Sequence, residues 1–133
     1  MRPAVEKIAG ACGTMAKILL AEDDQALRRF LKKALEKAGY TVIDFGEGRS
    51  AWEALEKEPV DLLLTDIVMP EMDGIELARR AAERYPDLKI MFITGFAAVA
   101  LNPDSKAPKE AQILSKPFHL RQLVDEVRRM MAA

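Results

Sequence analysis

The stretch VDLLLTDIVMPEMDGIELARRAAERYP, residues 60–86, indicates the fold class because its pattern predicts a strand, a loop and a helix in succession. Its first part, residues 60–65, is almost continuously apolar, which is typical of a strand buried on both faces of a sheet. Asp73 and Glu76 then match a capping box, so a helix is expected to begin there, and Pro86 is expected to close it. A strand followed directly by a helix is the repeating unit of α/β proteins.

The same alternation extends over the chain from Lys17 onward. Five short apolar runs are expected to be strands: residues 18–21, 41–45, 60–65, 90–93 and 111–114. Near-continuous apolar strands that alternate with helices predict a parallel sheet covered on both faces. Because the crossover connections in such a sheet are right-handed, the expected fold class is α/β with a doubly wound five-stranded parallel sheet.

Three further helices are expected, one of them between the first two strands. There the apolar residues follow the spacing i, i+3, i+4 and i+7, and Gly39 is expected to end the helix. Its expected inward positions are Leu27, Phe30, Leu31, Ala34, Leu35 and Ala38. Ser50 and Glu53 match a second capping box, and a last helix is expected from about His119. The connection 96–109 contains two prolines, which permit at most a short helix.

Length, charge and residue counts exclude several classes of protein. At 133 residues and a net charge of -1, the chain allows one ordinary domain and lacks the positive field of a nucleic-acid binder. With one cysteine, Cys12, and one histidine, His119, any metal site must use oxygen ligands. The longest apolar stretch, residues 90–101, is shorter than the ~20 residues needed to span a bilayer. A cytoplasmic protein without membrane contact is therefore expected.

Residues 1–15 differ from the rest of the chain. They have no continuous apolar block, and charged residues interrupt the run that an export signal needs. We interpret residues 1–15 as an N-terminal extension, disordered or left from cloning, and residues 16–133 as the folded domain.

Polar side chains follow four of the expected strands, at the sheet edge where ligands bind in doubly wound folds. They are Glu22, Asp23 and Asp24 after the first strand, Asp66 after the third, Thr94 at the end of the fourth and Lys116 after the fifth. Two carboxylates about 4 Å apart repel by about 1 kcal/mol in water and about 4 kcal/mol at an effective dielectric near 20. One lysine cannot neutralise three of them, but a small divalent cation can. We therefore predict a Mg²⁺ site on Glu22, Asp23 and Asp66, with Asp24 as a possible helix cap.

A cation, a lysine and a hydroxyl around one carboxylate are typical of a site for phosphoryl transfer. Asp66 is the candidate nucleophile and would form an aspartyl phosphate. Lys116 would neutralise one phosphoryl oxygen, and Thr94 would donate a hydrogen bond to another.

These residues resemble a known family. The run LLLTDIVMPEMDG around Asp66, the EDD after the first strand, Thr94-Gly95 and Lys116-Pro117 are similar to the receiver domain of two-component response regulators. The resemblance covers residues 17–133. It implies a flavodoxin-like (CheY-like) strand order 2-1-3-4-5, Asp66 as phosphoacceptor, and Glu22, Asp23 and the backbone carbonyl of Val68 at the metal.

The resemblance also implies the partners and the kind of activity. Phosphate would arrive from a histidine kinase or histidine phosphotransferase, and the domain would be a signalling module that assists its own phosphorylation rather than an independent enzyme. Two residues depart from the usual pattern: Ile113 stands where receivers usually have a switch aromatic, and Val68 cannot orient an attacking water. The Thr-to-aromatic switch is therefore not expected in its usual form, and Val68 favours slow dephosphorylation.

Three runs closely resemble a single-domain subgroup of alphaproteobacterial receivers: TDIVMPEMDGIELARR, KIMFITGFAAVALNPDSKAPKEA and LSKPFHLRQLVDEV. This resemblance implies an adaptor that, when unphosphorylated, primes the ClpXP protease in cell-cycle control, with the ClpX unfoldase as a partner. The apolar run 96–101 is either buried or a partner surface. One alternative is a phosphorelay intermediate without an effector of its own.

A second alternative is a dinucleotide-binding module. Gly46, Gly48 and Ala51 form the pattern G-x-G-x-x-A after the second strand. This interpretation leaves Glu22 and Lys116 without a role, and short glycine patterns often match by chance.

Overall fold

The computed structural model describes residues 16–95 and 104–132. Within these ranges, strands and helices alternate along the chain. The elements are β1 (Lys17–Ala21), α2 (Gln25–Lys37), β2 (Thr41–Phe45), α3 (Gly48–Lys57), β3 (Leu62–Thr65), α4 (Gly74–Arg84), β4 (Lys89–Thr94), β5 (Gln112–Ser115) and α6 (Leu120–Ala132).

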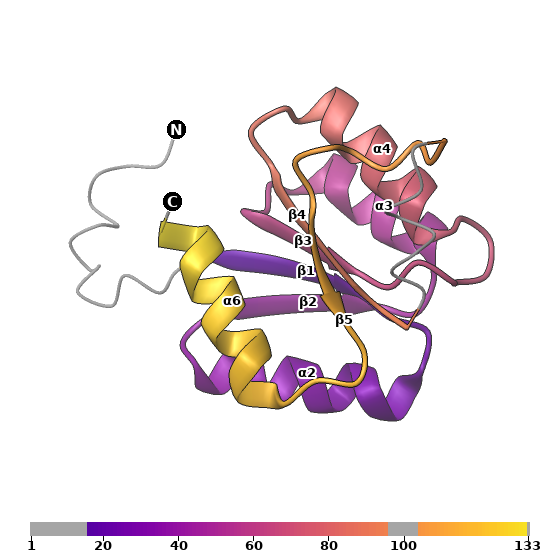
Figure 1. Cartoon of the computed structure of the whole chain (residues 1–133). Coiled ribbons are helices and arrows are strands. Elements are labelled where there is room, and N and C mark those ends of the chain that lie inside the picture. The colour runs from indigo at the N-terminus through magenta and orange to yellow at the C-terminus, as the bar shows by residue number, and fades with distance from the viewer. Residues whose placement is uncertain (1–15, 96–103, 133) are drawn as a thin grey trace.

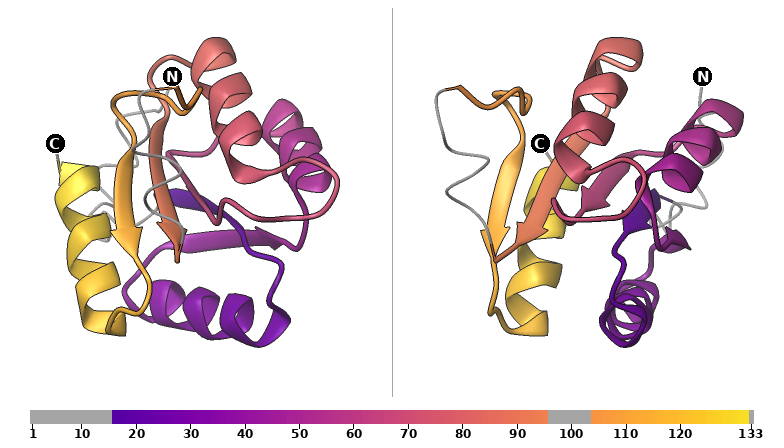
Figure 2. Two further views of the ribbon diagram at one scale, coloured as in Figure 1. Left: turned by 45° about the vertical axis from the view of Figure 1, so that its right-hand side comes forward. Right: turned by 90° about the vertical axis from the view of Figure 1, so that its right-hand side faces the viewer.

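The five strands form one parallel sheet, as their apolar pattern predicted, in the order β2-β1-β3-β4-β5 that the family resemblance implied. Helices α2 and α6 cover one face of the sheet, and α3 and α4 cover the other (Figures 1 and 2). The strand order reverses direction at β1, so the fold is doubly wound. In such a sheet the crevice for a ligand opens beyond the carboxyl ends of β1 and β3.

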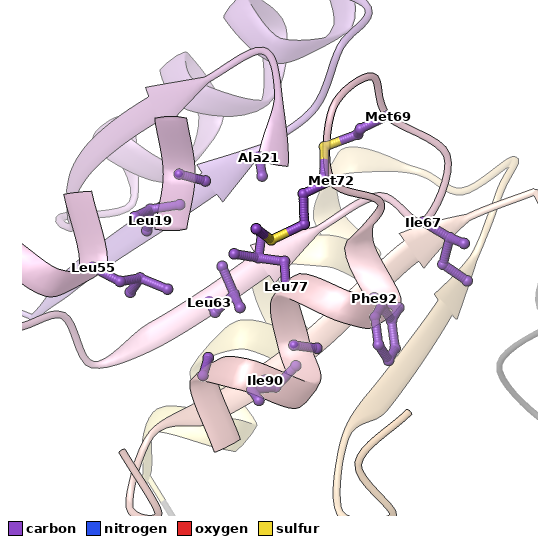
Figure 3. Packing of buried hydrophobic residues seen from close by; sticks show 13 residues of the cluster. Leu19, Ala21, Leu55, Leu63, Ile67, Met69, Met72, Leu77, Ile90 and Phe92 are labelled. Atoms are coloured by element: carbon purple, nitrogen blue, oxygen red, sulfur yellow. The ribbon is translucent and has the colours of Figure 1, made fainter. Parts of the chain in front are cut away.

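The three central strands, β1, β3 and β4, have no exposed face because helices pack on both sides of the sheet. Alternate residues of β1 point into different cores: Leu19 and Ala21 pack with α3 and α4, whereas Ile18 and Leu20 pack with α2 and α6. Figure 3 shows the first of these two clusters. Full burial of a leucine or isoleucine contributes about 1.5–3 kcal/mol, so the two cores hold the strand ends firmly in place.

Two predicted helix starts are confirmed by their caps. Asp24 accepts a hydrogen bond from the backbone N–H of Leu27 at 3.0 Å and begins α2. Asp73 accepts one from the N–H of Glu76 at 2.9 Å and begins α4. Each carboxylate satisfies a backbone donor that the first helical turn leaves without a partner.

Two expectations about the helices are wrong. Helix α3 begins at Gly48 with Glu47 at the cap position, and the Ser50 hydroxyl donates to Glu47 Oε1 at 3.0 Å instead of capping the helix itself. Phe30 is 57% exposed and does not belong to the core. Since each residue turns an α-helix by about 100°, Phe30 lies on the flank of the face that buries Leu31.

The segment between β4 and β5 contains turns and no helix over residues 104–111. The extension at residues 1–15 and the apolar run 96–101 lie outside the described residues. Among the helices that the structure describes, none has both the length and the apolar composition to cross a bilayer.

Candidate functional site

The carboxyl ends of four strands bring the predicted polar residues to one edge of the sheet. Glu22 follows β1, Asp66 follows β3, Thr94 ends β4 and Lys116 follows β5. Glu22 is 1% exposed, Asp66 is 7% exposed and Thr94 is fully buried. Buried charged and polar side chains are costly unless they are paired, so their partners define the site.

Lys116 joins the two buried carboxylates. Its Nζ lies 3.0 Å from Asp66 Oδ2 and 3.2 Å from Glu22 Oε1. The backbone N–H of Lys116 donates to the Thr94 carbonyl at 2.8 Å. This bond connects the start of the loop after β5 to the end of β4. The structure therefore brings together side chains from positions 22, 66 and 116, as the strand pattern predicted.

The remaining carboxylate oxygens accept backbone hydrogen bonds. Asp66 Oδ1 accepts from the N–H of Ile67 at 2.7 Å, and Glu22 Oε2 accepts from the N–H of Asp24 at 3.1 Å. Each carboxylate is thus held at both oxygens, which limits its rotation and directs it toward Lys116.

Three carboxylates share the site with one lysine. Glu22, Asp23 and Asp66 each offer an oxygen, and these oxygens all lie within 4.8 Å of one another. Carboxylate oxygens are the ligands that Mg²⁺ prefers, and Lys116 alone leaves excess negative charge. The donor set therefore fits a hard divalent cation. Val68 follows on the same loop with an exposed side chain.

The environment shifts the pKa of two of these groups. Burial raises the pKa of Glu22, and the charge of Asp66 adds to this, although the Asp24 N–H and Lys116 act in the opposite direction. Burial alone would lower the pKa of Lys116, but the hydrogen bond to Asp66 and the charges of Glu22 and Asp66 outweigh it and raise that pKa. Lys116 is therefore a permanent cation at neutral pH.

Two glycines allow the backbone to pack closely against the loop that begins at Asp66, a role that local sequence patterns do not reveal. A Cβ atom on Gly74 would lie 1.8 Å from the Asp66 carbonyl oxygen, and one on Gly48 would lie 1.8 Å from the Met72 carbonyl oxygen. The Gly74 N–H also donates to the Ile67 carbonyl at 2.7 Å. An Asp-Gly pair such as Asp73-Gly74 is typical of a loop, but only the tertiary structure shows these close approaches.

Met69 and Met72 anchor the same loop from the inside. Both side chains are buried in the cluster between the sheet and helices α3 and α4, as Figure 3 shows. Ile113, opposite Phe92 in the sheet, packs against this cluster as well. The loop after β3 is thus fixed by backbone contacts on one side and by apolar packing on the other.

The chain matches a known protein family and is similar to known proteins. The family model described as "Response regulator receiver domain" matches residues 18–128. The chain is 72% identical over 119 residues to the response regulator receiver protein CpdR of Brucella abortus, covering 90% of this chain and 99% of that protein. It is also 39% identical over 129 residues to the sensor kinase CckA of the same organism, covering 96% of this chain but 14% of the kinase.

A solved structure shares the fold. The response regulator TrrA of Thermotoga maritima, in complex with Mg²⁺ and BeF, superposes with a TM-score of 0.78 at 26% identity. The match covers 87% of this chain and 99% of that chain.

Proposed function

Because the chain belongs to the response regulator receiver family, we propose that it signals through phosphorylation of Asp66. Receivers are signalling domains of two-component systems, and the similarity to CpdR extends over almost the whole of that protein. The observation that carries the assignment is the pairing of buried Asp66 with Lys116 at 3.0 Å, beside a second buried carboxylate.

The transfer requires a carboxylate that is oriented and a cation that is already in place. A carboxylate oxygen of Asp66 forms the new bond to phosphorus while the bond from phosphorus to the donor nitrogen breaks, and the electron pair stays on that nitrogen. Lys116 neutralises charge on a phosphoryl oxygen, and the Thr94 hydroxyl donates to another. Because these groups are held before the donor arrives, little reorganisation is needed during the reaction.

The acidic residues of the site would bind a divalent cation. The carboxylates of Glu22, Asp23 and Asp66 and the backbone carbonyl of Val68 would hold Mg²⁺. When bound, the ion offsets the negative charge that the phosphoryl group adds. Glu22 contributes through its buried position, since Lys116 and the Asp24 N–H keep its carboxylate facing Asp66.

Binding of Mg²⁺ is expected to stabilise the folded protein. At a Mg²⁺ concentration ten times the Kd, native-state binding adds about 1.4 kcal/mol to the free energy of unfolding and raises Tm. The Asp23→Asn variant should lose this increase, because it lacks one ligand. Thermal unfolding of the wild type and of Asp23→Asn, each with and without MgCl₂, measures the two changes in Tm.

Asp24→Asn is the matched control for that experiment. It removes one charge from the neighbouring residue, but asparagine still caps α2. Its Tm should still rise with Mg²⁺. Equal Mg²⁺ responses of the Asp23 and Asp24 variants would contradict the assignment of Asp23 as a ligand.

The phosphoryl donor is a histidine kinase or a histidine phosphotransfer protein. Membership of the receiver family implies such a donor. The sensor kinase CckA of Brucella abortus contains a stretch similar to this chain. Receiver domains related to this one thus also occur within sensor kinases.

We further propose that the output is a phosphorylation-dependent contact with ClpX, in which the unphosphorylated protein acts as an adaptor for the ClpXP protease. The similarity to CpdR supports this role. The immobilised protein should retain ClpX in the absence of phosphodonor and release it when Mg²⁺ and beryllofluoride are added. An Asp66→Asn variant should retain ClpX under both conditions. Retention that does not respond to beryllofluoride in the wild type would contradict the dependence on phosphorylation, and no retention under either condition would exclude the adaptor role.

A further inference from the structure

Arg28, near the start of α2, connects the end of β1 to the neighbouring strand. Its Nη1 donates to the backbone carbonyl of Glu22 at 2.7 Å, and its Nε donates to Asp44 Oδ2 at 3.1 Å. Asp44 lies on β2, next to β1 in the sheet. The Arg28 side chain is largely buried, with 19% of its surface exposed. It makes these two contacts through separate nitrogens, which a lysine ammonium cannot do.

Arg28 completes the support of the Glu22 main chain. The Glu22 N–H donates to the Phe45 carbonyl at 3.0 Å, and the Glu22 carbonyl accepts from Arg28. These two bonds fix the backbone from which the buried Glu22 carboxylate reaches Lys116. A shift of the carbonyl would therefore move the carboxylate away from Asp66.

Gly46 makes room for the guanidinium. A Cβ atom at this position would lie 2.7 Å from Arg28 Nη1, and its three nearest neighbours would all be atoms of Arg28. The φ angle of Gly46 is not in the left-handed region, so alanine is compatible with the backbone. This explains the first glycine of the G-x-G pattern after β2 without a nucleotide.

We propose that Arg28 is a positioning residue for the cation site, acting through the Glu22 carbonyl and oriented by Asp44 and Gly46. This inference rests on the proposed function, in which Glu22 is a Mg²⁺ ligand. It assigns a role in metal binding to a basic residue that does not touch the metal. Residues that orient metal ligands commonly change metal affinity by 10- to 100-fold when they are replaced.

The direction of the effect separates positioning from simple charge. Removing a positive charge near the acidic residues would strengthen Mg²⁺ binding by Coulomb's law. Loss of positioning has the opposite result, because Glu22 is then less well placed. A purely structural role would lower the Tm of the metal-free protein and leave the Kd for Mg²⁺ unchanged.

The test is calorimetric titration of the full chain with MgCl₂, together with the Tm of each metal-free variant. Arg28→Met should raise the Kd about tenfold. Gly46→Ala should also raise it, although it keeps every charge, because the new methyl group displaces the guanidinium. Lys32→Met is the matched control: Lys32 also pairs with Asp44, at 3.2 Å, so the variant removes one positive charge from the same ion-pair cluster. Its Kd should be unchanged or lower.

Two results would overturn the role of Arg28. One is wild-type affinity or tighter binding in folded Arg28→Met. The other is the same increase in Kd for Arg28→Met and Lys32→Met. If Arg28→Met does not fold, the Kd of Gly46→Ala for Mg²⁺ decides: a raised Kd supports positioning, and an unchanged Kd contradicts it. A wild-type protein that does not bind Mg²⁺ would instead contradict the proposed function itself, and this inference with it.

Discussion

The Asp66→Asn variant is expected to accept no phosphoryl group from a small phosphodonor such as acetyl phosphate. The wild type should gain the mass of one phosphoryl group in the presence of Mg²⁺. The reason is chemical: an amide oxygen is too weak a nucleophile to replace the carboxylate. Intact-mass spectrometry measures the result, and the gain in mass should be absent from the variant.

Asp73→Asn is the control for this experiment. Asp73 lies on the loop that Asp66 begins, and asparagine can still cap α4 through the N–H of Glu76. This variant should be phosphorylated like the wild type. A mass gain that persists in Asp66→Asn would show that the phosphoacceptor is another residue.

The second large effect is expected for Lys116→Met, which should slow phosphorylation of Asp66 about 10²-fold. Lys116 is the cation that contacts both buried carboxylates, so its removal takes away charge stabilisation where the phosphoryl oxygens arrive. The rate of mass gain with acetyl phosphate measures this. Lys109→Met serves as control, because Lys109 is an exposed lysine in the segment before β5.

The Lys116→Met substitution should also change how the stability of the protein depends on pH. The pKa of Glu22 is raised in the folded protein above its ordinary value of 4.5, so the folded state binds protons more tightly there. The resulting stabilisation is complete below pH 4.5 and is lost as the pH rises through the folded-state pKa. Lys116 lowers that pKa, and without it the loss extends to higher pH. The difference in Tm between wild type and Lys116→Met should therefore be larger at pH 7 than at pH 5.

Magnesium should partly restore the stability of Lys116→Met. The cation supplies positive charge beside Glu22 and Asp66, which the variant otherwise leaves without a cationic partner. The increase in Tm on adding MgCl₂ should thus exceed that of the wild type at pH 7. A Tm difference independent of both pH and Mg²⁺ would argue against electrostatic compensation by Lys116.

Much of the site could be predicted from the sequence, because it is built at strand ends. Glu22, Asp66, Thr94 and Lys116 each stand directly at or after an apolar run, and parallel strands bring such positions to one edge. Asp24 and Asp73 were recognisable as caps from local spacing alone. The two cap predictions are confirmed because each depends on a chain segment of a few residues.

The supporting contacts could not be predicted in this way. Arg28 belongs to the polar side of an amphipathic helix, and nothing local shows that its guanidinium reaches the Glu22 carbonyl. Gly48 and Gly74 are needed because backbone from another segment passes within the space of a side chain. Phe30 follows helical spacing but lies on the flank of the buried face.

Local sequence patterns were enough to predict the succession of strands and helices along the chain, the two carboxylate caps and the types of side chain at the site, because apolar periodicity and hydrogen-bonding capacity are local properties. The tertiary structure decided which oxygens Lys116 contacts, how deeply Glu22 and Asp66 are buried, and how Arg28, Gly46, Gly48 and Gly74 hold them. Those features depend on distances between segments far apart along the chain, and such distances are set only when the two cores pack against the sheet.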